Sequence, residues 1–196
     1  MKNFRKLLLI ILSLLLVLSI FTACGKKDEG NIVVISVEDY GDITVELMPE
    51  YAPKTVEHFK ELVKKGHYDN TIFHRIMSGF MIQGGGYDLN NLNDVKPASN
   101  VKGEFKNNFF SQNTLSHERG VISMARAKDP NSATSQFFIV HEDSTFLDGD
   151  YAAFGKVTKG MDVVDKIANS QVTYNPYTGE NSVPVKYPVI TSIKMK

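Results

Sequence analysis

Arg75 is the residue of this 196-residue sequence whose setting most suggests chemistry. It ends a stretch, Thr71–Arg75, that is otherwise largely apolar and typical of a β-strand. A guanidinium is rarely placed in such a stretch without a partner or a task, because burying an unpaired charge is costly. We therefore expect Arg75 to be either a fixed cationic donor in an active site or one half of a structural salt bridge.

The other reactive side chains do not form a catalytic or metal-binding pattern. The five histidines lack ligand spacing, and a single cysteine allows neither an intrachain disulfide nor a cysteine-rich zinc site. No Ser-His-Asp or paired-carboxylate arrangement can be picked out. Gly84–Gly86 is not followed by the Lys-Ser/Thr of a phosphate-binding loop. We therefore predict that the protein uses no metal and no cofactor.

Net charge argues against nucleic acid as a partner. The chain has 22 basic and 22 acidic residues, and three of the basic ones lie in the first 23 positions. The remainder thus carries 19 basic against 22 acidic side chains, whereas a nucleic-acid-binding domain normally has a basic excess.

The N-terminal segment has the pattern of an export signal. Three basic residues precede an apolar run, Leu7–Phe21, which is shorter than the roughly 20 residues that span a bilayer and matches a signal-peptide core. The run ends in Phe21-Thr22-Ala23-Cys24-Gly25, which resembles the lipobox of bacterial lipoproteins. The alternative is a buried cysteine after an uncleaved anchor helix.

The sole cysteine falls at the position that lipidation requires, which favours the lipoprotein interpretation. We therefore predict a signal peptide over residues 1–23, a lipidated tether over 24–31 and one folded domain over 32–196. Acyl chains on Cys24 would anchor the protein in membrane lipid on the outer, extracytoplasmic side of the bacterial cell membrane.

Short apolar segments bounded by Gly, Asn, Asp or Pro follow the tether. Strands are predicted at 32–37, 43–47, 71–75, 80–83, 120–125, 135–140, 152–157 and 189–193. Helical periodicity predicts a helix that begins at Pro53 and stops before Gly66, and a shorter one at 162–168. Residues 87–118 are rich in Asn and are predicted to be a surface excursion. The pattern indicates a mainly β protein, a barrel or sandwich with helical caps.

Several motifs, taken in order, resemble the cyclophilin family of peptidyl-prolyl cis-trans isomerases. They are Phe73–Gly86, Ser123–Ala125, Ser135–Ile139, Phe146–Gly149 and Phe154–Val157, together with matches to the opening hairpin and first helix. The likeness spans roughly residues 32–196. It implies a closed antiparallel eight-stranded barrel with a helix over each end.

The resemblance also implies a reaction and a site. Rotation about an X–Pro bond breaks no bond, but midway the prolyl nitrogen becomes a lone-pair acceptor, and Arg75 is the matching donor. Catalytic roles fall to Arg75, Phe80 and Gln83. Substrate contacts fall to a larger set, which comprises His74, Met81, Ala125, Arg126, Gln136, Phe138, Phe146, Leu147 and Tyr151.

Phe146 and Tyr151 stand where the family often has Trp and His, and Arg126 where it often has Asn. These departures leave Arg75 and Phe80 unchanged, so activity is expected to persist with altered specificity.

The expected partners are proline-containing polypeptides, exported or unfolded, and the protein is expected to be a monomer. The alternative function is a non-catalytic chaperone or adaptor that binds proline peptides in the same groove. Arg75 favours the enzyme, because a binder has no need of a transition-state donor.

Overall fold

The computed structural model describes residues 29–196. The predicted signal peptide and the lipidation site at Cys24 lie outside the described residues, so these expectations remain predictions. Within the described part of the chain, no helix combines the length and apolar character needed to cross a bilayer.

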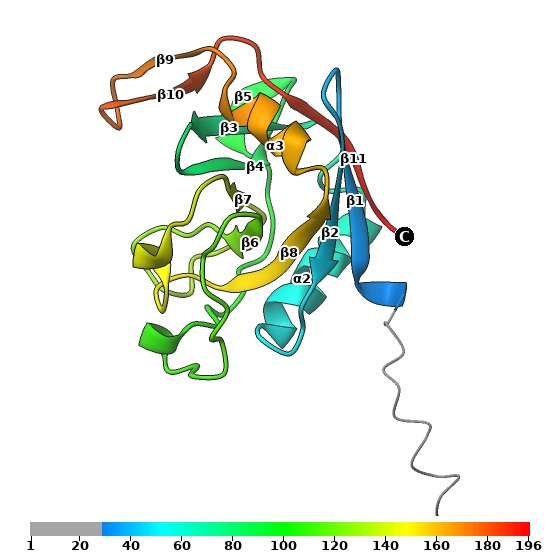
Figure 1. Ribbon diagram of the computed structural model, residues 1–196, viewed down its shortest axis with the longest axis vertical. Helices are drawn as coiled ribbons and strands as arrows, with labels where there is room; N and C mark the ends of the chain where they lie inside the picture. Colours follow the sequence, from blue (N-terminus) through cyan, green and yellow to red (C-terminus); the bar gives the residue numbers. More distant parts are fainter. Residues whose placement is uncertain (1–28) are drawn as a thin grey trace, which may run out of the picture.

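Eight antiparallel strands form a closed barrel (Figure 1). Hydrogen bonding runs in the order β3-β11-β1-β2-β8-β6-β7-β4, and pairing of β4 with β3 closes the circle. The strands are β1 (Ile32–Val37), β2 (Gly41–Leu47), β3 (Thr71–Met77), β4 (Met81–Asp88), β6 (Val121–Met124), β7 (Phe137–Val140), β8 (Ala153–Lys159) and β11 (Val189–Met195). The predicted barrel is thereby confirmed.

Side chains alternate between the two faces of each strand, and those on one face form the core. Strand β1, for example, buries every second residue: Val33, Ile35 and Val37. Aromatic rings fill the middle of the barrel, where Phe59 contacts Tyr68, Phe137 and Phe154 at centroid distances of 5.1–5.8 Å. Such packing fixes the strands that carry the functional side chains.

Two α-helices cover the barrel ends, α2 (Pro53–Lys64) and α3 (Met161–Ala168), on opposite sides in Figure 1. The first begins at Pro53, whose fixed φ suits a first turn, and buries Val56, Phe59 and Leu62 on one face. The second buries Val163, Val164 and Ile167 against the other end of the same core.

Several elements were not predicted. Strand β5 (Asn91–Val95) extends the sheet beyond β4, and β9 (Val172–Asn175) and β10 (Glu180–Pro184) form a separate hairpin that lies beside β3 (Figure 1). Short 3-10 helices are η1 (Glu29–Asn31), η2 (Lys106–Asn108) and η3 (Thr145–Leu147).

The segment 87–118 is a surface excursion only in its first part. Strand β5 is fully exposed, but Glu104, Phe105, Asn108, Asn113 and His117 are buried. The prediction was wrong for these five residues. The polar ones among them are buried with hydrogen-bond partners, which a hydrophobicity pattern does not detect.

Candidate active site

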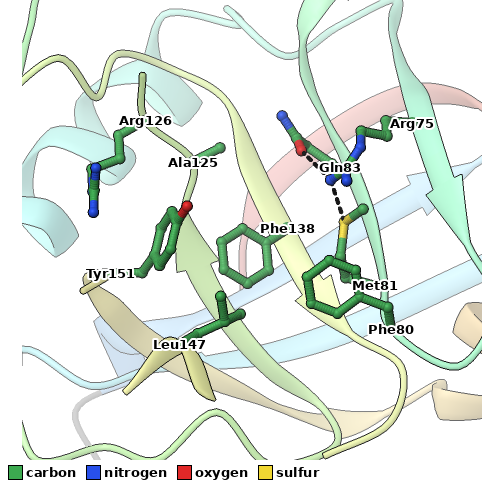
Figure 2. Close-up of a pocket in the computed structure, with 9 residues that line it drawn as sticks. All are labelled: Arg75, Phe80, Met81, Gln83, Ala125, Arg126, Phe138, Leu147 and Tyr151. Carbon is green, nitrogen blue, oxygen red and sulfur yellow. Dashed lines mark hydrogen bonds between the residues drawn. The ribbon is translucent and has the colours of Figure 1, made fainter. Parts of the chain in front are cut away.

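A cavity of about 180 Å³ opens on the barrel surface beside β4 and β7. Figure 2 shows Phe138 at its centre, Arg75 and Gln83 at one end, and Arg126 and Tyr151 at the other. The full lining is Arg75, Phe80, Met81, Gln83, Ala125, Arg126, Phe138, Leu147 and Tyr151. We call this space the active-site cavity.

Strand register places the polar end of the active-site cavity. Arg75 on β3 lies opposite Gln83 on β4, and Gln83 lies opposite Phe138 on β7. Three neighbouring strands thus present a cation, an amide and an aromatic ring at one level of the barrel. Met81, two residues before Gln83, faces the same side because strand side chains alternate.

Arg75 is held by a carboxylate from the separate hairpin. Its Nε and Nη2 donate to Oε2 and Oε1 of Glu180, both at 2.8 Å. Its Nη1 lies 3.4 Å from Oε1 of Gln83. The hydrogen bonds from Arg75 lower the pKa of Glu180, so this carboxylate is ionised at neutral pH. The sequence left Arg75 either as a donor in an active site or as half of a salt bridge. These alternatives are not exclusive, because the guanidinium is ion-paired and also lines a cavity.

Apolar side chains form the floor of the active-site cavity. Met81, Phe138 and Leu147 belong to one buried cluster, and Phe80, Ala125 and Tyr151 pack against it. The Tyr151 ring meets Phe138 edge to face at 5.7 Å, and the Arg126 guanidinium lies 4.7 Å from the Tyr151 centroid. A hollow of this size, with an apolar floor and an arginine at each end, suits a small ring that carries a polar atom at its edge.

Asp148, His117 and Ser123 form a hydrogen-bonded row that packs against Phe138. Oδ1 of Asp148 lies 2.8 Å from Nδ1 of His117, and Nε2 of His117 lies 3.0 Å from Oγ of Ser123. The imidazole is nearly parallel to the Phe138 ring, at 6.0 Å and 17°. Burial lowers the pKa of His117, and Asp148 only partly opposes that effect. Ser123 is fully buried, so its hydroxyl is not accessible to a substrate as a nucleophile would have to be.

Sequence reasoning missed this row and Glu180. His117 and Asp148 are 31 positions apart, and Arg75 and Glu180 are 105 apart. Neither separation carries a local signal. Asp148 does lie within the quoted motif 146–149, and Ser123 within 123–125. These motifs were the sequence signal that could have pointed to the two residues.

Three predicted site residues do not line the active-site cavity. Gln136 accepts a hydrogen bond from Nε2 of Gln83 at 3.0 Å and lines an adjoining hollow of about 310 Å³. The Phe146 ring is 71% exposed, 5.5 Å from that of Phe80. His74 lines a separate groove, where its ring meets Tyr87 at 4.7 Å.

Among residues 29–196, no three His, Cys, Asp or Glu side chains are grouped so that they could hold a metal ion.

Comparison with known proteins places this geometry in a family. The model for the cyclophilin type peptidyl-prolyl cis-trans isomerase family matches residues 32–195. A peptidyl-prolyl cis-trans isomerase of Acinetobacter baylyi is 42% identical over 172 residues, which cover 85% of this chain and 87% of that protein. One of Streptomyces antibioticus is 42% identical over 165 residues, with 79% and 93% covered.

Solved structures of cyclophilins also resemble this chain. A cyclophilin of Hirschia baltica matches with a TM-score of 0.69 at 27% identity and covers 86% of this chain and 74% of its own. A cyclophilin type isomerase of Cryptosporidium parvum, crystallised in the presence of the dipeptide Ala-Pro, matches with a TM-score of 0.66 at 29% identity, with 84% and 98% covered.

The chain therefore belongs to the cyclophilin type peptidyl-prolyl cis-trans isomerase family, and it is an isomerase of X–Pro peptide bonds.

Proposed function

We propose that this isomerase acts at the outer face of the membrane, where a lipid on Cys24 tethers it and exported or unfolded polypeptides are its substrates. The observation that carries the location is the sole cysteine, placed directly after Leu7–Phe21 and Thr22-Ala23. The polar residues 25–31 leave a short spacer before β1 begins at Ile32. Newly exported chains are unfolded, and their X–Pro bonds are about 10–30% cis, so an isomerase there has substrates.

We assign the chemical step to Arg75. Uncatalysed rotation is limited by amide resonance, with a barrier of about 18–20 kcal/mol. In the twisted state the prolyl nitrogen loses its conjugation and accepts a hydrogen bond, so a donor beside it stabilises that state more than either planar state. Nη1 of Arg75 is the donor we assign, because Nε and Nη2 are both bound to Glu180.

The remaining stabilisation must come from the cavity. Raising a turnover from about 10⁻² to about 10³ per second requires roughly 7 kcal/mol. One charge-assisted hydrogen bond in a dry site supplies about 3–4 kcal/mol. We assign the rest to the grip of Phe138 and Met81 on the proline ring and to amide contacts from Gln83 and Gln136, which hold one side of the bond while the other turns.

A protease-coupled assay on a short X–Pro peptide tests the chemical assignment. Arg75→Ala is expected to lower kcat/KM by about 10²–10³-fold, while thermal unfolding shows that the protein is still folded. Lys60→Ala, a substitution of a cation on α2 away from the active-site cavity, is the control and should leave the rate unchanged. A folded Arg75→Ala protein with the parent rate would favour the adaptor function instead.

The location is tested separately. Mass spectrometry of protein purified from cells is expected to show a mature chain that starts at a diacylated Cys24, and Cys24→Ser is expected to release the protein from the membrane fraction. An unmodified Cys24 thiol in cell-derived protein would refute the tether and leave the assignment of Arg75 intact.

A further inference from the structure

Glu180 is a residue of a peripheral hairpin that reaches the active site. It begins β10, in the two-stranded sheet that is separate from the barrel, and this strand packs beside β3. Its carboxylate meets Arg75 on two parallel hydrogen bonds of 2.8 Å. This two-point contact matches the planar fork of a guanidinium and fixes its orientation as well as its position.

The ion pair between Arg75 and Glu180 leaves Nη1 of the guanidinium available to the substrate. Nε and Nη2 face Glu180, whereas Nη1 faces the cavity side, 3.4 Å from Oε1 of Gln83 and 3.9 Å from the sulfur of Met81. The side chains of Arg75 and Glu180 are 27% and 28% exposed, so the pair is more shielded from water than an ordinary surface ion pair. Such a two-point pair restricts the orientations that the guanidinium can take.

The hairpin holds the carboxylate in turn. The Ser182 hydroxyl lies 3.5 Å from Oε2 of Glu180. Ser182 is 1% exposed, so the inner face of β10 is packed against the barrel. Glu180 thus lies on a strand that is packed against the barrel. The hairpin contributes no side chain to the lining of the active-site cavity, so Glu180 reaches the cavity only through Arg75.

We propose that Glu180 is a positioning residue for catalysis, which turns the Arg75 guanidinium so that Nη1 points at the prolyl nitrogen. The proposal rests on the role assigned to Arg75. A carboxylate also draws charge from the guanidinium, which would weaken the donor. We give orientation the greater weight because a misplacement of about 1 Å in a site can cost about 10²-fold in rate, and because Nη1 itself does not touch the carboxylate.

The test compares Glu180→Gln and Glu180→Ala with the parent in the isomerase assay. Each is expected to lower kcat by about tenfold while KM changes by less than twofold, because the substrate contacts on Phe138 and Met81 are untouched. The matched control is Glu57→Gln, which removes a carboxylate from an exposed ion pair with Lys54 on α2 and should leave both constants unchanged.

Two further measurements separate positioning from general structure. In an Arg75→Ala background, Glu180→Gln is expected to cause no further loss, because Glu180 acts through Arg75. In nuclear magnetic resonance spectra, the Arg75 Nε–H signal of the parent is expected to be shifted and slow to exchange, and Glu180→Gln should return it to the position of free arginine.

The outcomes are distinguishable. Parent or higher kcat in folded Glu180→Gln, with Arg75→Ala inactive, would overturn this proposal alone. Parent kcat in Arg75→Ala would overturn the chemical assignment on which it rests. An additional loss in the double variant would show that Glu180 acts on the fold rather than through Arg75, and would also overturn it.

Discussion

His74 and Arg75 are neighbours on β3, between the core residues Phe73 and Ile76, but they line different hollows of the surface and meet different environments. Arg75 binds the Glu180 carboxylate and lines the active-site cavity, whereas Nδ1 of His74 is buried without a hydrogen-bond partner. Burial, and to a lesser extent the charge of Arg75, lower the pKa of His74 from 6.5 to about 4. The imidazole is therefore neutral in the folded protein at any pH above about 5.

This neutrality predicts acid sensitivity. In the unfolded chain His74 takes up a proton near pH 6.5, whereas the folded protein resists protonation until about pH 4. The contribution of neutral His74 to the free energy of unfolding is fully present above pH 6.5. It falls by up to about 3 kcal/mol as the pH drops towards 4. His74→Phe keeps a ring against Tyr87 and removes the titration.

Urea unfolding at pH 7.5 and 4.5 measures the effect. The free energy of unfolding of the parent is expected to fall by more between the two pH values than that of His74→Phe. The lowered pKa values of His67 and His117 act in the same direction, so the variant should retain part of the acid sensitivity. Equal losses in parent and variant would contradict the role given to His74.

Helix α2 begins without a cap of its own. Ala52 occupies the N-cap position and has no side-chain acceptor, so the first N–H groups need a partner from elsewhere. Glu104 supplies it from a loop about fifty residues away: its carboxylate accepts from the backbone N–H groups of Lys54 and Thr55 at 3.0 and 2.8 Å and from the Thr55 hydroxyl at 2.8 Å. A negative charge at this end also suits the helix dipole.

Replacing this cap is expected to destabilise the fold. Glu104 is 3% exposed, so Glu104→Ala would leave three donors without their acceptor, two of them buried, and lower the free energy of unfolding by about 2–4 kcal/mol. Glu57→Gln in the same helix disturbs only an exposed pair and should leave the urea midpoint close to that of the parent. Urea midpoints of the two variants provide the comparison, and equal midpoints would show that Glu104 is not the cap.

Elements were predictable from the sequence where burial follows a period. Strand β1 and helix α2 bury alternate or helically spaced apolar residues, and their predicted positions agree with the structure. The β9–β10 hairpin escaped prediction because its inner face consists of little more than Ser182 and Pro184, so no apolar alternation marks it.

At the scale of the whole molecule, closure of the barrel depends on pairing between distant segments. Strand β11 is hydrogen-bonded to β1 on one side and β3 on the other, although it lies at the end of the chain. Periodicity alone predicted the strands but did not decide between a barrel and a sandwich. The family motifs supplied the topology and most of the cavity lining, whereas Glu180 and His117 required the three-dimensional pairing.

Removal of β11 is therefore expected to abolish folding. A chain that ends at residue 188 would expose the edges of β1 and β3 and the core beneath Ile190 and Ile193, so its circular dichroism should show no cooperative thermal transition. As a control, replacement of residues 89–94 by Asn-Gly shortens the exposed β5 hairpin and should keep the melting temperature within a few degrees. A cooperative transition in the truncated chain would contradict this view of closure.

The register of β1 and β11 sets Val33 opposite Met195, so the two ends of the barrel domain leave the fold side by side. A short peptide bridge could join them, and new ends could be opened in the exposed turn after β4, which would yield a circular permutant with the same barrel and the same cavity. A fluorescent or affinity tag placed after Lys196 would emerge next to the start of β1, whose Val33 pairs with Met195.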